Sequence, residues 1–168
     1  MSLVLAALAV AACADPAEPA RAQSDTTVRS SARDPALDAA RKQATDALPV
    51  FWAKFNAHAE GYSRFAVKAL FPTDDGRGQE ALWIAVFEVA PDGKVRGRLA
   101  SAPEAIKNLQ PGQPVEFQPS RIVDWQYVKD GRAYGHFSTR AMMSRVSAAE
   151  RAEASAFLAP TPLEAGDH

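Results

Sequence analysis

The residues with the greatest chemical potential lie close together, between Asp124 and Arg140. Asp124 and Trp125 precede the tight turn "KDGR", and a histidine and a Thr-Arg pair follow it. A carboxylate whose pKa is raised by burial can act as a general base, and His136 on the other arm of the same hairpin could be its partner. The candidate binding residues are Asp124, Trp125, Tyr134, His136, Thr139 and Arg140.

A structural role explains the same residues more simply. A buried Asp124 could pair with Arg140 or cap backbone amides at the end of the hairpin, and a carboxylate satisfied in this way is inert. Trp125 is more typical of sheet packing than of ligand stacking, and a cap or turn explains Thr139. Catalysis would require that Asp124 and His136 lie within about 6 Å of each other and are not both enclosed. We favour the structural role.

Composition argues against several other kinds of site. The chain has 168 residues and a formal net charge of -1, so no basic field indicates a nucleic-acid partner. The histidines at 58, 136 and 168 lack the spacing of metal ligands, and a single cysteine excludes an internal disulfide. We therefore expect no metal, no cofactor and no nucleic acid.

The single cysteine, Cys13, predicts a membrane anchor. It follows an uncharged apolar run, Leu3 to Ala12, which is too short to span a bilayer core of about 30 Å. "VAAC" resembles the lipobox of bacterial lipoproteins, although no Lys or Arg precedes the apolar run. That resemblance implies cleavage before Cys13, a diacylglycerol thioether and an acylated amine, which together anchor a protein stably. The alternative is a core cysteine in an N-terminal helix. Because Ala14 follows, the expected location in a Gram-negative organism is the periplasmic face of the outer membrane.

Composition along the chain predicts one folded domain between two disordered ends. We predict a signal peptide over residues 1–12, a disordered tether over 13–33, one domain over 34–158 and a disordered tail over 159–168. The tether has almost no large apolar residues and many Ala, Ser and Pro residues, so it cannot bury a core. The whole chain is 47% hydrophobic, which is enough for one core elsewhere.

The hydrophobic pattern predicts an α+β fold. Asp34 and Pro35 are typical of a helix start, and an amphipathic helix follows that either kinks at Pro49 or restarts after Asp46. Ser147 and Glu150 form a capping box for a short C-terminal helix. The strand candidates are "RFAVKALF", "ALWIAVFEVA", "VRGRL", "PVEFQP", "RIVDWQYV" and "AYGHF". We predict a curved antiparallel sheet of five or six strands, which could be a half-open small barrel, with the N-terminal helix on one face.

Ten residues in the central part of the chain carry a family resemblance. They are Glu80, Trp83, Gly97, Pro103, Gly112, Asp124, Trp125, Gly135, Thr139 and Arg140. In this order and spacing, over roughly residues 47–145, the chain resembles the YegJ-like domain, domain of unknown function 2314. The resemblance implies a small domain with no established catalytic activity.

Together these features predict a membrane-anchored envelope lipoprotein whose domain binds a partner and has no catalysis of its own. The expected partners are the membrane, through Cys13, and an envelope protein. One alternative is a cell-envelope hydrolase or transferase that uses Asp124, His136 and Arg140. Another is an inhibitor or immunity-type protein, which would need a large exposed complementary patch.

Overall fold

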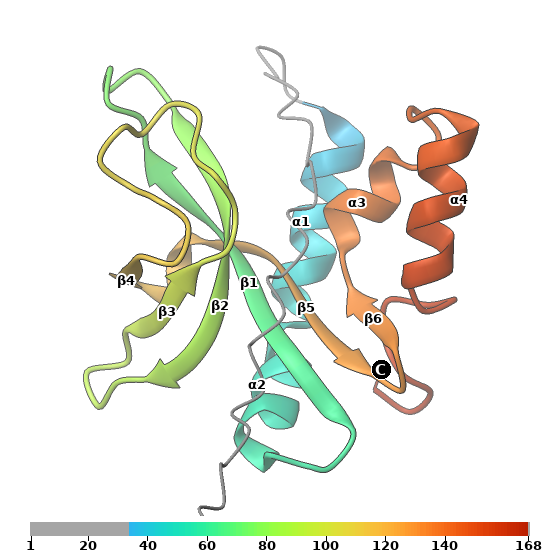
Figure 1. Cartoon of the computed structure of the whole chain (residues 1–168). Coiled ribbons are helices and arrows are strands. Elements are labelled where there is room, and N and C mark those ends of the chain that lie inside the picture. Colours follow the sequence, from blue (N-terminus) through green and yellow to red (C-terminus); the bar gives the residue numbers. More distant parts are fainter. Residues whose placement is uncertain (1–33, 168) are drawn as a thin grey trace, which may run out of the picture.

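Six antiparallel strands form one open sheet in the computed structural model, which describes residues 34–167 (Figure 1). The order across the sheet is β4-β3-β2-β1-β5-β6. The strands are β1 (Tyr62–Pro72), β2 (Gln79–Val89), β3 (Val95–Leu99), β4 (Pro114–Phe117), β5 (Ile122–Lys129) and β6 (Arg132–Gly135), and a 3-10 turn, η1 (Pro119–Arg121), precedes β5. The predicted α+β fold and strand number are confirmed. The predicted signal peptide over 1–12, Cys13 and the tether over 13–33 lie outside the described residues.

Two helices precede the sheet, α1 (Pro35–Asp46) and α2 (Leu48–Ala57). The Asp34 carboxylate accepts the Ala36 N–H at 3.0 Å and caps α1, as its sequence predicts. The sequence allowed either a kink at Pro49 or a second helix after Asp46, and the structure has the second helix. Pro49 lies in the first turn of α2, where its missing N–H costs no helical hydrogen bond.

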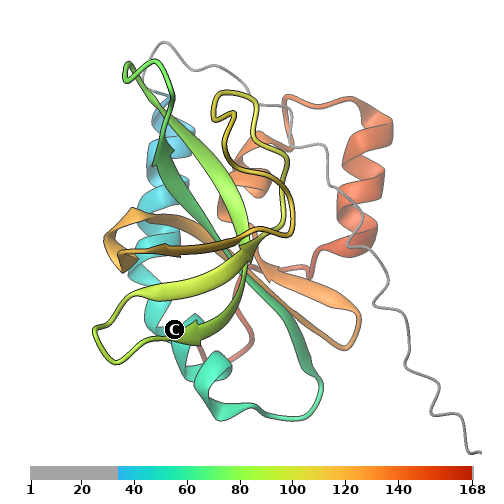
Figure 2. The ribbon, with the colours of Figure 1, turned by 60° about the vertical axis from the view of Figure 1, so that its left-hand side comes forward.

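Both helices lie on one face of the sheet, which we call the helix face (Figure 2). The Trp125 indole Nε1 donates to the Ala44 carbonyl at 2.8 Å, and the Phe51 ring centre lies 5.8 Å from that of Trp125. The fully buried strand residues of this face include Val67, Leu82, Ile84, Trp125 and Tyr127. Burial of these large side chains against the helices supplies most of the core.

Irregular pairing bends the sheet. The β1–β5 register shifts twice, between Ser63 and Ala66 and between Lys68 and Ala69, and the β2–β3 register shifts between Val86 and Glu88. Such bulges increase strand twist and curvature. The sheet is therefore curved but remains open, because β4 and β6 are its two edges.

Two short helices follow the sheet, α3 (Phe137–Met142) and α4 (Ala148–Phe157). The capping box predicted from Ser147 and Glu150 is present at the start of α4. α4 lies over the face opposite to α1, where Leu158 packs with Val128 and Ala133. In Figure 1, α3 stands next to α1, and α4 lies beyond α3 at the β6 side of the sheet.

The segment 159–167, which we call the C-terminal strap, differs from the disordered tail predicted over 159–168. Its backbone pairs with β6, and Glu164 accepts hydrogen bonds from Tyr62 and Tyr127 at 2.9 Å each. Leu163 packs against the core. The proline-rich composition is that of a tail, but the partly buried Glu164 and Leu163 hold the strap in place.

Candidate functional site

Asp124 lies in the middle of β5 and is fully buried, with an exposed fraction of 0%. Its Oδ1 accepts the Trp125 N–H at 2.8 Å and the Phe137 N–H at 3.0 Å. Its Oδ2 accepts the Ser138 N–H at 2.8 Å and the Ser138 hydroxyl at 2.5 Å. Four donors therefore surround the carboxylate, which caps the first turn of α3.

The surroundings of Asp124 act on its pKa in opposite directions. Burial raises the pKa, whereas hydrogen bonds from Ser138 and Trp125 and the positive charge of Lys68 lower it, and the net direction is upward. Lys68 lies directly across from Asp124 on β1. A carboxylate with this many donors is positioned to hold α3 against β5 rather than to take a proton from a substrate.

Arg140 binds backbone carbonyls. Its Nε donates to the Gly135 carbonyl at 2.8 Å, and its Nη2 lies 3.4 Å from the carbonyls of Ala133 and Thr161. Among residues 34–167 no ion pair joins Arg140 to Asp124, although the negative charge of Asp124 acts on it at longer range. Of the two structural roles considered for Asp124, the structure has the amide cap and not the Arg140 pair. The physical reason is that α3 turns the Arg140 side chain toward β6 and the strap.

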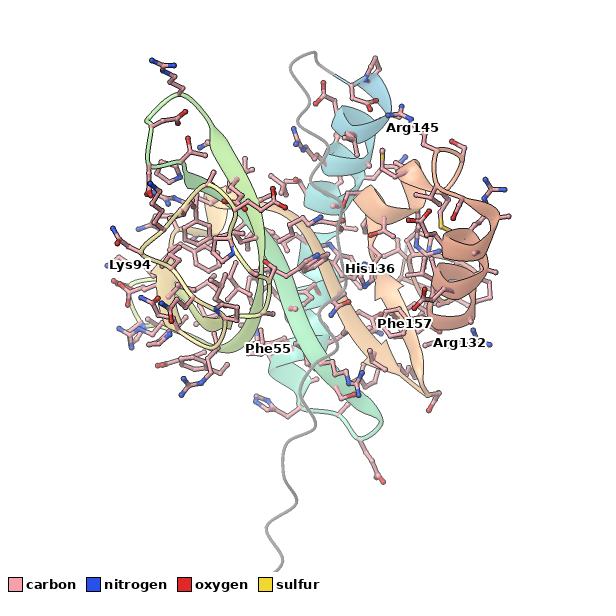
Figure 3. The ribbon with its side chains drawn as sticks, turned by 45° about the horizontal axis from the view of Figure 1, so that its top comes forward. Phe55, Lys94, Arg132, His136, Arg145 and Phe157 are labelled. Carbon is pink, nitrogen blue, oxygen red and sulfur yellow. The ribbon has the colours of Figure 1, made fainter. Side chains whose placement is uncertain are left out.

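His136 is also enclosed, with an exposed fraction of 2%. Its ring lies between Trp83 and Phe157, at centroid distances of 5.1 and 5.8 Å, and Figure 3 shows His136 and Phe157 together. Its Nδ1 is 3.3 Å from the Thr139 hydroxyl. Within the described chain no group of three or more His, Cys, Asp and Glu side chains could hold a metal.

The two aromatic candidates belong to the core of the helix face. Trp125 is fully buried and stacks on Tyr127 at 5.8 Å, and Tyr127 stacks on Tyr134 at 5.3 Å. Tyr134 is half-buried. Because Asp124 and His136 are both enclosed, the hydrolase or transferase alternative loses its geometric support.

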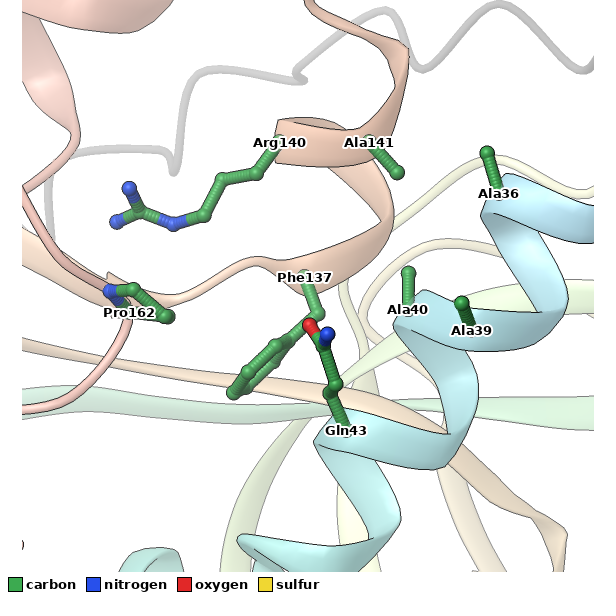
Figure 4. A pocket seen from close by; sticks show the side chains of 8 residues that line it. All are labelled: Ala36, Ala39, Ala40, Gln43, Phe137, Arg140, Ala141 and Pro162. Atoms are coloured by element: carbon green, nitrogen blue, oxygen red, sulfur yellow. The ribbon is translucent and has the colours of Figure 1, made fainter. Parts of the chain in front are cut away.

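Arg140 instead lies between two adjoining hollows, which share Arg140 and Pro162 in their linings. The smaller, of about 210 Å³, lies between α1 and α3, and Figure 4 shows the Arg140 side chain extending toward Pro162 beside it. The larger, of about 610 Å³, is lined by Arg132, Arg140, Met143, Ser155, Leu158, Ala159, Pro160 and Pro162. We call the larger hollow the arginine groove. Its lining has two guanidinium groups and no acidic side chain.

The six candidate binding residues predicted from the sequence include Arg140 but not Arg132. Arg132 lies at the start of β6, and its Nη1 donates to the Ala156 carbonyl at 2.5 Å, at the end of α4. No motif connects these positions, because the approach of α4 to β6 depends on tertiary packing.

A family model described as an uncharacterized protein conserved in bacteria, domain of unknown function 2314, matches residues 34–158. No curated protein and no solved structure matches the chain. Over the described residues, no helix has both the length and the apolar character needed to cross a membrane.

Proposed function

The chain belongs to this bacterial family, and from that premise we propose that it is an envelope lipoprotein whose domain binds a protein partner through the arginine groove. The lipid anchor would be attached to Cys13, on the periplasmic face of the outer membrane if the organism is Gram-negative. The domain would have no catalysis of its own. The sequence around Cys13 supports the anchor, and the groove supports the binding role.

The observation that carries the binding role is the charge of the arginine groove. Arg132 and Arg140 line the same hollow, and their hydrogen bonds go to backbone carbonyls. Neither guanidinium is neutralised by an acidic side chain of the lining. Arginine beside apolar side chains is typical of the energetically important parts of protein interfaces.

The binding role can be tested by site-specific photo-crosslinking in cells. A photoreactive amino acid is placed at Ser155, which is exposed and lines the groove, or at Ala152, which is exposed on the same helix outside the lining. We expect a crosslinked partner from position 155 that is absent from position 152. Arg132→Gln in the Ser155 background should reduce the yield several-fold, with thermal unfolding as a check on folding. Equal crosslinking from both positions, or none from either, would contradict the proposal.

The anchor can be tested separately through Cys13. We expect radiolabelled palmitate to be incorporated into the protein and the protein to sediment with membranes. Cys13→Ser should lose both the label and the sedimentation. Retention of the label in that variant would refute lipidation at this position without affecting the groove.

A further inference from the structure

The C-terminal strap binds the free edge of β6 in the way that a separate peptide would. Leu158, the residue just before the strap, forms a parallel bridge with Ala133, and the Ala159 N–H of the strap donates to the Ala133 carbonyl at 2.9 Å. Further along, the Gly135 N–H donates to the Pro162 carbonyl at 2.8 Å. Main-chain bonds to an edge strand, with side chains placed in pockets, are a recurring mode of peptide recognition.

The side chain that the strap places most specifically is Glu164. Its carboxylate accepts hydrogen bonds from the Tyr62 and Tyr127 hydroxyls, at 2.9 Å each, and from the Lys129 ammonium. The Lys54 ammonium lies 3.5 Å from the same carboxylate. The Glu164 side chain is 12% exposed. We call Lys54, Tyr62, Tyr127 and Lys129 the carboxylate cage. Burial opposes ionisation of Glu164, but the hydrogen bonds from Lys129 and the tyrosines outweigh it and lower the pKa.

The cage and its carboxylate come from different parts of the chain. Its four residues lie in α2, β1 and β5, inside the family match over 34–158, whereas Glu164 lies beyond its end. Lys54 and Lys129 both approach the Tyr62 ring, with ammonium-to-centroid distances of 5.6 and 5.0 Å. Both ammonium groups also contact the Glu164 carboxylate, and two positive charges that converge on one point favour an anion there. The domain therefore presents an anion site that the strap fills.

We propose that the β6 edge and the carboxylate cage form a peptide-binding site, and that the strap is an internal ligand occupying it until a segment of a partner protein displaces it. The strap defines the ligand: an extended segment whose apolar residue, like Leu163, precedes a glutamate that enters the cage. This inference goes beyond the proposed function, since it does not require the lipid anchor. Ala159, Pro160 and Pro162 of the strap also line the arginine groove, so displacement of the strap would remove part of that lining.

A tethered ligand competes at an effective concentration on the order of millimolar, so an external peptide binds measurably when the strap is weakened. Glu164→Gln removes the charge from the cage and leaves the backbone pairing intact. The probe is a fluorescent peptide with the sequence of residues 158–167, "LAPTPLEAGD", added to the full chain. The control peptide has Gln in place of its Glu.

We expect the probe to bind the Glu164→Gln chain at least about tenfold more tightly than the unaltered chain, measured by fluorescence anisotropy. The Gln control peptide should bind at least about tenfold more weakly than the probe. Asp167→Asn, on the same strap, should change probe affinity less than Glu164→Gln, because Asp167 contacts one lysine of the cage. Equal binding of the two peptides, or no binding by the Glu164→Gln chain, would overturn the proposal.

A second measurement on the unaltered chain keeps the test valid if Glu164→Gln fails to fold. The Gly135 amide reports strap docking, because its acceptor is the Pro162 carbonyl. We expect the Gly135 and Ala159 amides to exchange with solvent about 100-fold faster than amides of the β1–β2 ladder, through opening of the strap alone. Exchange of these amides only by global unfolding would show that the strap is a permanent part of the fold and would refute the proposal.

Discussion

Replacing Asp124 tests whether the most conspicuous carboxylate of the chain acts structurally. Asp124→Ala removes the acceptor of three N–H groups and one hydroxyl in a site with an exposed fraction of 0%. Each buried donor left without an acceptor costs about 1–3 kcal/mol. Because water can enter part of the vacated space, we expect a loss of about 4 kcal/mol in the free energy of unfolding. That is a large fraction of the roughly 5–15 kcal/mol typical of a domain.

Two further variants grade the effect by geometry. Asp124→Asn preserves the oxygen that accepts the Trp125 and Phe137 amides, but it turns an NH₂ group toward the Ser138 N–H. The Ser138 hydroxyl can rotate to accept from that group, so we expect a loss of about 2 kcal/mol. Ser138→Ala removes one of the four donors and leaves a carboxylate with three, so we expect a loss of about 1 kcal/mol.

The assay is urea unfolding followed by tryptophan fluorescence, with the slope against urea required to stay constant among variants. The expected order of destabilisation is Asp124→Ala, then Asp124→Asn, then Ser138→Ala. The reasoning is refuted if Asp124→Asn is as stable as the unaltered chain or more so. A carboxylate whose removal stabilises the fold is retained for function, which would return Asp124 to the candidate active site.

Two further predictions concern the ends of α1 and β6. Gly135 and Gly131 both have positive φ, but a Cβ at Gly135 would lie 2.1 Å from the Trp125 carbonyl oxygen, whereas one at Gly131 meets nothing within 4 Å. Gly131→Ala should therefore cost about 1–2 kcal/mol and Gly135→Ala at least about 3 kcal/mol in urea unfolding, and equal costs would contradict the close approach. The hydrogen bond from Arg145 lowers the pKa of Asp34 to about 2 in the folded chain. The Asp34–Arg145 pair therefore stabilises the fold above about pH 3.9, the pKa of Asp in an unfolded chain, and this stabilisation is lost as the pH falls toward 2. In Arg145→Ala the Asp34 pKa, followed by carbon-13 NMR, should rise toward its ordinary value; an unchanged pKa would show that Arg145 is not the cause.

The helices and strands could be predicted because capping residues and apolar periodicity mark them in the local sequence. Asp34 and Pro35 specify the start of α1, and the Ser147–Glu150 capping box specifies α4. Alternation of apolar residues predicted the strands, and the short turns between most of them predicted antiparallel pairing, whereas the order across the sheet came from the structure. At Pro49 the sequence left two outcomes open, since proline both breaks a helix and favours its first turn.

The contacts of the candidate site could not be predicted in the same way. Asp124 binds amides of Phe137 and Ser138, which follow the hairpin, and strand periodicity does not fix how α3 returns to β5. Glu164 is 102 residues from Tyr62, and neither residue carries a local signal of the other. Proline-rich composition predicts disorder when tertiary contacts are unknown, so the strap was predicted to be a tail.

The residues that carried the family resemblance are largely constraints of the fold. The Glu80 carboxylate accepts two backbone amides of the loop before β4, and a Cβ at Gly97 would lie 2.3 Å from an Ile84 methyl carbon. Asp124 caps α3, and Gly135 lies against the Trp125 carbonyl. A pattern of this kind identifies the domain because it specifies the backbone, and it therefore contains little information about what the domain binds.

Most of the side chains proposed to give specificity lie outside that pattern, Arg140 of the groove being the exception. The cage residues Lys54, Tyr62, Tyr127 and Lys129 and the groove residue Arg132 were not among the ten that carried the resemblance, yet they line the sites where charge meets apolar surface. If binding depends on them, members of the family could share one backbone and still recognise different partners by changing these positions. The strap would then be the feature that adapts the common site to this chain, because it supplies a ligand for the cage from beyond the family match.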